Sequence, residues 1–151
     1  MTTTTMYPGR RFARGYGNPV TEFDGAQARV QCRQLATVAT IGGQIDEHNI
    51  DRVRQFAKRY VLSEKPFVLD LSGVNFFSAQ GMSLLHCIDE TCSTVGVEWC
   101  LIAGQPVKDM LRAFDGEAAF PTADSAPEAL NYFLDAARER RRLLPLLTKT
   151  A

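Results

Sequence analysis

The sequence predicts an α/β fold in which strands alternate with helices around a mixed, mainly parallel sheet. Apolar runs of strand length alternate with stretches whose apolar residues recur at helical spacing. The 151 residues fit one domain of ordinary size. No apolar run approaches the ~18 residues needed to span a bilayer. We therefore expect a single domain of about five strands and about four helices, in the order β-β-α-β-α-β-α-β-α.

The first half of the chain predicts two strands and a helix. Apolar and polar residues alternate over 26–33, which is typical of a half-exposed strand. A Thr- and Val-rich strand over 35–41 is expected to end at the glycine pair 42–43. Helical spacing follows over 50–61, with Asn49 placed to cap the free amides at the helix start.

The second half continues the alternation. An apolar run at 67–71 predicts a strand buried on both faces. A helix is expected over 79–95, followed by a buried strand over 97–103. The remaining elements are a short helix over 107–114 stopped by Gly116, a brief strand around Phe120, and a last helix that starts at the capping box Ser125–Glu128 and buries Leu130, Phe133, Leu134 and Ala137.

Charge divides the chain into an acidic body with basic ends. Residues 1–21 contain three arginines and no acid, so we interpret them as a flexible basic arm. Residues 22–137 form the predicted domain, and residues 138–151 a basic C-terminal tail. The acidic body disfavours nucleic acid as a partner. Because no signal or spanning segment is visible, we expect a cytoplasmic protein that does not enter a membrane.

The motifs of common catalytic sites are missing from the sequence. It contains no phosphate-binding glycine loop and no G-x-S-x-G turn. Its four cysteines and two histidines show neither a disulfide framework nor zinc spacing, which favours cysteines acting as small buried apolar residues. A redox contact between Cys32 and Cys100 stays open if their strands are neighbours. We expect no catalytic residue, no metal and no cofactor.

A strand, loop and helix over Val68–Met82 resemble the STAS family, the sulphate-transporter and anti-sigma-factor-antagonist domain. The hallmark of that family is a strand similar to V-L-D-L-S-x-V-x-F, followed by Asp-Ser-(Ser or Thr)-Gly and a Leu-rich helix. The turn Gly43–Asp46, followed by Asn49, is similar to the family's turn before its first helix. A weaker match lies at Glu128–Leu130. The resemblance extends over roughly residues 26–137 in the family's element order.

The resemblance implies a small antagonist that binds a serine-kinase anti-sigma factor and so frees a sigma factor. In the family, the kinase silences the antagonist by phosphorylating the first Ser of the motif. Carried over by position, the family's Asp falls on Ser78, the phosphoacceptor on Ala79, the next residue on Gln80 and the glycine on Gly81. Asp46 matches the Asp of the upstream turn, which belongs to the family's partner-binding face.

The departure at Ala79 means that phosphorylation is not expected at the usual position, because Ala has no hydroxyl. Ser78 is interpreted mainly as the helix N-cap, with its hydroxyl bonded to a backbone amide, and otherwise as a substitute acceptor. Close approach of strand and helix explains Gly81 without a ligand, and Asp46 has the alternative of supporting the first helix turn. The candidate partner-binding residues are Asp46, Asn49, Ser78, Ala79, Gln80, Gly81 and Met82.

Three functions remain in competition. The first is an antagonist that binds a kinase-type anti-sigma factor without phosphate control at Ala79. The second is a STAS module that senses a small ligand such as a nucleotide, or assembles with other STAS proteins. The third, an enzyme, is disfavoured by the missing motifs. In the first case Asp46 and Ala79 should lie at one edge of the sheet, where the carboxyl ends of the strands gather.

Overall fold

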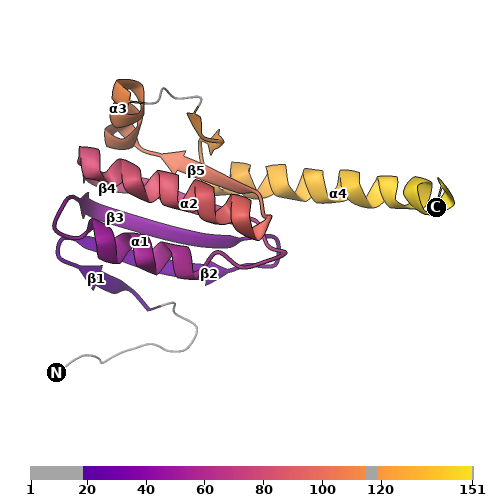
Figure 1. The fold of residues 1–151 in the computed structure, drawn as a ribbon, viewed down its shortest axis with the longest axis horizontal. Coiled ribbons are helices and arrows are strands. Elements are labelled where there is room, and N and C mark those ends of the chain that lie inside the picture. The colour runs from indigo at the N-terminus through magenta and orange to yellow at the C-terminus, as the bar shows by residue number, and fades with distance from the viewer. Residues whose placement is uncertain (1–18, 115–118, 151) are drawn as a thin grey trace.

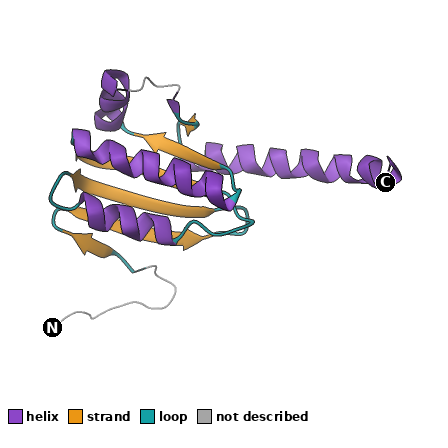
Figure 2. Cartoon of the chain, viewed as in Figure 1, coloured by secondary structure: helices purple, strands orange, loops and turns teal. Residues whose placement is uncertain are grey.

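A mixed sheet forms the centre of the molecule (Figures 1 and 2). The computed structural model describes residues 19–114 and 119–150, and within them the sheet has six strands in sequential order. The strands are β1 (Thr21–Phe23), β2 (Ala26–Cys32), β3 (Thr37–Ile45), β4 (Phe67–Phe77), β5 (Trp99–Ala103) and β6 (Thr122–Ala123). The pairs β1–β2 and β2–β3 are antiparallel, and the pairs β3–β4, β4–β5 and β5–β6 are parallel. The predicted α/β class is confirmed, with one strand more than expected.

Four α-helices within the described residues connect or follow the strands. They are α1 (Ile50–Arg59), α2 (Met82–Val95), α3 (Gln105–Phe114) and α4 (Ala126–Thr150), and a 3-10 turn, η1 (Ala79–Gly81), leads into α2. Figure 1 shows α1 and α2 side by side on one face of the sheet, with α4 on the other. The parallel β3, β4 and β5 are each followed by a helix that returns the chain to the next strand.

Two apolar clusters pack against the sheet, one on each face. The larger one fills the space beneath α1 and α2 and includes Leu69 and Leu71 of β4. The smaller one includes Val68 of the same strand and Phe133 of α4. Successive residues of a strand point to opposite faces, so both faces of β4 are covered. This confirms the expectation that the apolar run at 67–71 is buried on both sides.

The predicted end of the second strand at the glycine pair was wrong. β3 continues through Gly42 and Gly43 to Ile45. Gly43 has a φ of +88°, and a Cβ there would lie 2.3 Å from the carbonyl oxygen of Gly25. The glycine therefore permits a close approach between β2 and β3 at a place where the pairing of β3 with β4 shifts register. The glycine pair, which the sequence suggested as the end of the strand, lies inside β3.

Other element boundaries also differ from the prediction. The unpredicted β1 is joined to β2 by a tight turn at Asp24 and Gly25, both with positive φ. β4 extends six residues beyond its predicted end at 71, to Phe77. Residues 79–81, expected to begin a helix, form η1 instead. β5 begins at Trp99, two residues later than predicted. The brief strand lies at 122–123, just after Phe120.

The N-terminus of α4 confirms half of the predicted capping box. The Ser125 hydroxyl accepts a hydrogen bond from the Glu128 amide at 3.2 Å. The Glu128 carboxylate, however, accepts from the Asp124 amide at 2.9 Å, one residue before the expected partner. Phe133 is buried, while Leu130, Leu134 and Ala137 are half-buried.

Beyond the sheet, α4 projects away from the body of the domain (Figure 1). It continues without a break across residue 138, and residues 138–142 are exposed. The predicted arm over most of 1–21 and the stop at Gly116 lie outside the described residues. Among the described helices, none has the length and apolar content that crossing a bilayer requires.

The four cysteines are all free thiols. Cys92 and Cys100 are buried, as expected for small apolar residues, while Cys87 is half-buried and Cys32 exposed. Cys32 in β2 and Cys100 in β5 are separated by β3 and β4. Three strand spacings of about 4.8 Å place them far beyond the ~7 Å Cα separation that a disulfide allows. The redox contact between these two residues is therefore excluded.

Candidate functional site

Two turns meet at the edge of the sheet where β3 and β4 end. Ile45, the last residue of β3, pairs with Phe77, the last residue of β4. The Ser78 amide then donates to the Ile45 carbonyl at 3.0 Å. The turns that follow therefore start side by side, one with Asp46 and the other leading to Ala79. This confirms that the two turns share one edge of the sheet.

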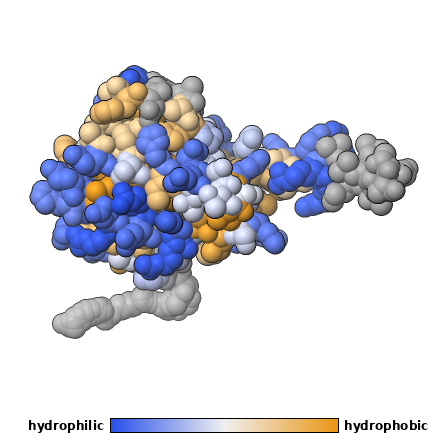
Figure 3. All heavy atoms as spheres, in the orientation of Figure 1, coloured by the Kyte–Doolittle hydropathy of each residue, from blue (hydrophilic) through white to orange (hydrophobic). Residues whose placement is uncertain are grey.

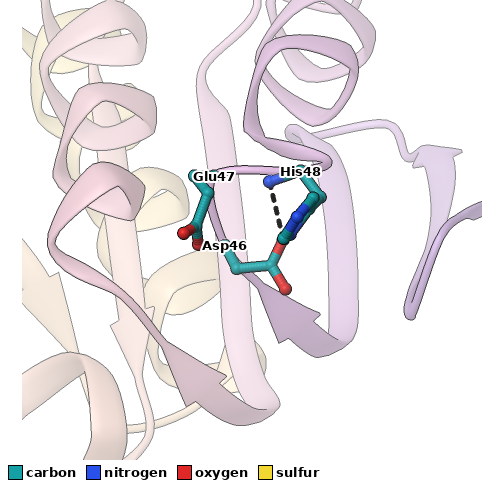
Figure 4. Close-up of side chains that lie close together, drawn as sticks. All are labelled: Asp46, Glu47 and His48. Atoms are coloured by element: carbon teal, nitrogen blue, oxygen red, sulfur yellow. Dashed lines mark hydrogen bonds and ion pairs between the residues drawn. The ribbon is translucent and has the colours of Figure 1, made fainter.

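Asp46 organises the first turn through its own side chain (Figure 4). Its carboxylate accepts a hydrogen bond from the His48 amide at 2.9 Å. Its carbonyl accepts from the Ile50 amide at 3.0 Å, which begins the first turn of α1. Asp46 is half-buried, whereas Glu47 and His48 are exposed. The alternative role of Asp46, support of the first helix turn, is thus present in the structure.

Asn49 does not cap the helix as predicted. Its side chain makes no capping hydrogen bond, although it occupies the N-cap position. Its Nδ2 donates to the carbonyls of Phe23 at 2.8 Å and Gln44 at 2.9 Å, and its Oδ1 accepts from the Asp46 amide at 3.1 Å. The buried amide thus satisfies backbone groups of β1, β3 and the turn. Asn49 therefore stabilises the edge of the sheet through buried hydrogen bonds and is not itself exposed there.

The second turn presents small and polar side chains. Ala79 and Gln80 are exposed, whereas Gly81 and Met82 are buried. Ser78 is extended, with φ −81° and ψ 171°, and its side chain makes no capping hydrogen bond. Its hydroxyl oxygen is buried without a hydrogen-bond partner in the described part of the chain. The prediction that this hydroxyl binds a backbone amide is therefore wrong.

Gly81 is explained by packing. A Cβ at this position would lie 2.6 Å from Cε1 of the Phe77 ring. Phe77 is itself only 4% exposed, so its ring has little room to move. The glycine lets η1 pass closely over the end of β4, which confirms the close approach expected from the sequence.

A polar link between α1 and α2 supports the second turn, and sequence analysis missed it. Arg54 donates from Nη1 to the Ser83 hydroxyl at 3.1 Å, and that hydroxyl donates to the Gln80 carbonyl at 2.8 Å. Arg54 also pairs with Asp51 at 2.9 Å. Only the spacing of Arg54 and Asp51, three residues apart on a helix, is visible in the sequence.

The accessible part of this edge is a small surface that we call the carboxyl-edge patch. Phe76, which is 50% exposed, adds an apolar side chain that sequence analysis did not single out. Phe76 was not singled out because β4 was expected to end at residue 71, which placed Phe76 in the loop between strand and helix. The patch consists of Glu47, His48, Phe76, Ala79 and Gln80.

Side-chain ligand atoms of Asp46, Glu47 and His48 lie within 4.8 Å of one another. Figure 4 shows the three side chains gathered on the turn. His48 is exposed over 78% of its side chain. Exposed groups of this kind are common on proteins that bind no metal, so we assign no ion to them.

These features define a class of protein. The STAS domain family model matches residues 27–129, and the chain belongs to the STAS domain family. The chain is 41% identical over 140 residues to Osmosensory protein A of Mycobacterium tuberculosis, with 89% of each protein covered.

Solved structures share the fold. An anti-sigma factor antagonist from Mycobacterium paratuberculosis superposes with a TM-score of 0.62 at 22% identity, covering 73% of this chain and 95% of that one. A variant of RsbS from Moorella thermoacetica gives a TM-score of 0.62 at 15% identity, covering 74% and 97%. The fold is therefore that of anti-sigma factor antagonists.

Proposed function

We propose that this protein is a non-enzymatic, cytoplasmic regulator that binds a serine-kinase-type anti-sigma factor through the carboxyl-edge patch. Binding would withhold the anti-sigma factor and so influence transcription by its sigma factor. The fold shared with an anti-sigma factor antagonist supports this proposal. The juxtaposition of the Asp46 and Ala79 turns supports the choice of surface, since Ile45 and Phe77 pair where both turns begin.

The exposed Ala79 is the observation on which the regulatory part of the proposal depends. A phosphate would add about −1.5 to −2 charges and three acceptor oxygens to this patch. Ala79 cannot receive it, and the neighbouring Ser78 hydroxyl is buried. A kinase would have to unfold the turn to reach Ser78, so we place any control by phosphate elsewhere in the chain.

Co-purification from the native cell, followed by mass spectrometry, tests the partner. We expect a kinase-type anti-sigma factor to be captured. Incubation of the purified pair with ATP should leave residues 76–83 unmodified. An Ala79→Ser variant should keep partner binding and supply a hydroxyl at the exposed position. Phosphate on Ser78 of the parent protein would contradict the proposal, as would capture without any anti-sigma factor.

The name of the Mycobacterium tuberculosis relative supports an osmotic input for this regulator. We propose that partner binding, or the amount of the complex, responds to external osmolarity. Quantifying the complex in cells before and after an osmotic shift tests this, with a temperature shift as the control. An unchanged amount of complex would remove the osmotic input and leave the partner proposal intact.

A further inference from the structure

A cavity of about 570 Å³ lies away from the carboxyl-edge patch, on the β5–β6 side of the sheet. It opens near the amino end of β5, where Trp99 begins the strand, and is bounded by the first two turns of α4 through Glu128 and Tyr132. The volume is within the range of small-molecule sites, roughly 300–1,000 Å³. The STAS comparisons and the proposed partner surface assign nothing to it.

The lining of the cavity has a single sign of charge. Asp89, Glu98 and Glu128 contribute carboxylates, and no Lys, Arg or His is among the described lining residues. The Asp89 carboxylate accepts from Trp99 Nε1 at 2.9 Å, and the Glu128 carboxylate accepts from a backbone amide. Neither bond neutralises the charge. The Glu98 carboxylate has no hydrogen bond or ion pair with the rest of the described chain.

Two buried thiols, Cys92 and Cys100, lie close enough to these carboxylates to be affected by their charge. Burial, and then the charge of Glu128, raises the pKa of Cys100 to about 11. Burial, and then the charge of Asp89, raises the pKa of Cys92 to about 12. Two of the lining carboxylates therefore oppose ionisation of the neighbouring thiols.

Two aromatic residues, Trp99 and Tyr132, also line the cavity. Trp99 is held in place by Asp89 and by a tilted contact with Phe120 at 5.8 Å between ring centroids. Tyr132 is 60% exposed and lines the same cavity. Aromatic faces beside carboxylates attract organic cations by cation–π and Coulomb interactions, and they pack against methylene groups.

We propose that this cavity binds a small aliphatic polyamine. Several ammonium groups on one flexible chain match three separated carboxylates, and the methylene segments match the aromatic and apolar lining. An anion would be repelled, and a neutral ligand would gain nothing from the negative charge of the lining. The proposal is independent of the anti-sigma partner.

Trp99 is the only tryptophan of the chain, so its fluorescence reports directly on the cavity. We would titrate the full-length protein with spermidine and confirm the result by calorimetry. A saturable response is expected, and it should weaken with added NaCl. Glu98→Gln should weaken spermidine binding roughly two- to fivefold, the range for one partly exposed ion pair.

Glu90→Gln is the matched control, because Glu90 is an exposed residue of α2 outside the cavity lining. This variant should bind spermidine as the parent does. Absence of heat and of a fluorescence response would overturn the proposal. Equal weakening by Glu98→Gln and Glu90→Gln would also overturn it, because nonspecific attraction to an acidic surface would then suffice. The same response to MgCl₂ at equal ionic strength would lead to that conclusion as well.

Discussion

At the scale of single residues, the site depends on polar groups that are buried beneath it. Asn49 is fully buried and bonds backbone groups of three separate segments. Its type and position suggested a helix cap. A cap and a buried bridge both require a short amide side chain before a helix, so the sequence could not distinguish them.

Replacing Asn49 by Ala should destabilise the fold by about 2–4 kcal/mol, since it leaves buried carbonyls of Phe23 and Gln44 without donors. Urea denaturation measures the change. Asn75→Ala, at an exposed position of β4, is the control and should stay within about 0.5 kcal/mol of the parent. A loss for Asn49→Ala no larger than for the control would contradict the bridging role.

Because the thiol of Cys92 is buried, we expect the free energy of unfolding to fall as the pH becomes alkaline. Burial raises its folded pKa from 9.0 to about 12, so ionisation favours the unfolded chain. The resulting stability is complete below about pH 9 and is lost as the pH rises toward 12. Between pH 8 and 10.5, the unfolding free energy of Cys92→Ala should therefore fall less steeply than that of the parent. Parallel pH profiles would contradict this.

At the scale of elements, apolar periodicity predicted the alternation of strands and helices correctly. In β4 over 67–71 and in α1 over 50–59, most of the apolar residues that formed the pattern are buried. Some predicted element boundaries were wrong, among them the one placed at a glycine pair. Gly43 indicated a strand end but accommodates a close approach inside β3, and short β1 has too few residues to show a pattern. Such contacts between distant segments are invisible to local patterns.

The junction between β4 and α2 gives a prediction at this scale. Gly81→Ala should cost about 1–3 kcal/mol, because its Cβ would overlap the Phe77 ring. Combining it with Phe77→Leu, which removes the ring, should cost less than the sum of the two single changes. Thermal or urea unfolding of the four proteins completes the cycle. Strict additivity would show that the ring is not the reason for the glycine.

At the scale of the whole molecule, the domain has two separate features of interest at different places on the sheet. The carboxyl-edge patch was predictable in outline, because the motif around Ala79 and the turn at Asp46 follow consecutive parallel strands. The cavity was not predictable, because Asp89 comes from α2, Glu98 from the loop before β5 and Glu128 from α4. The surface over α1 is mainly hydrophilic, and apolar side chains gather around α3 (Figure 3).

The affinity of the protein for its kinase-type anti-sigma factor tests the central claim most directly. Ala79→Glu would place a carboxylate in the exposed second turn, and an unpaired charge at an interface costs about 2 kcal/mol or more, roughly 30-fold in Kd. The control is Thr94→Glu, at an exposed position near the C-terminal end of α2, roughly 20 Å from Ala79.

Calorimetry or surface plasmon resonance with the captured anti-sigma factor measures both variants. We predict that Ala79→Glu weakens binding by about 30-fold or more, whereas Thr94→Glu binds within twofold of the parent. Equal affinity of Ala79→Glu and the parent protein would contradict the account, because the carboxyl-edge patch would then lie outside the interface.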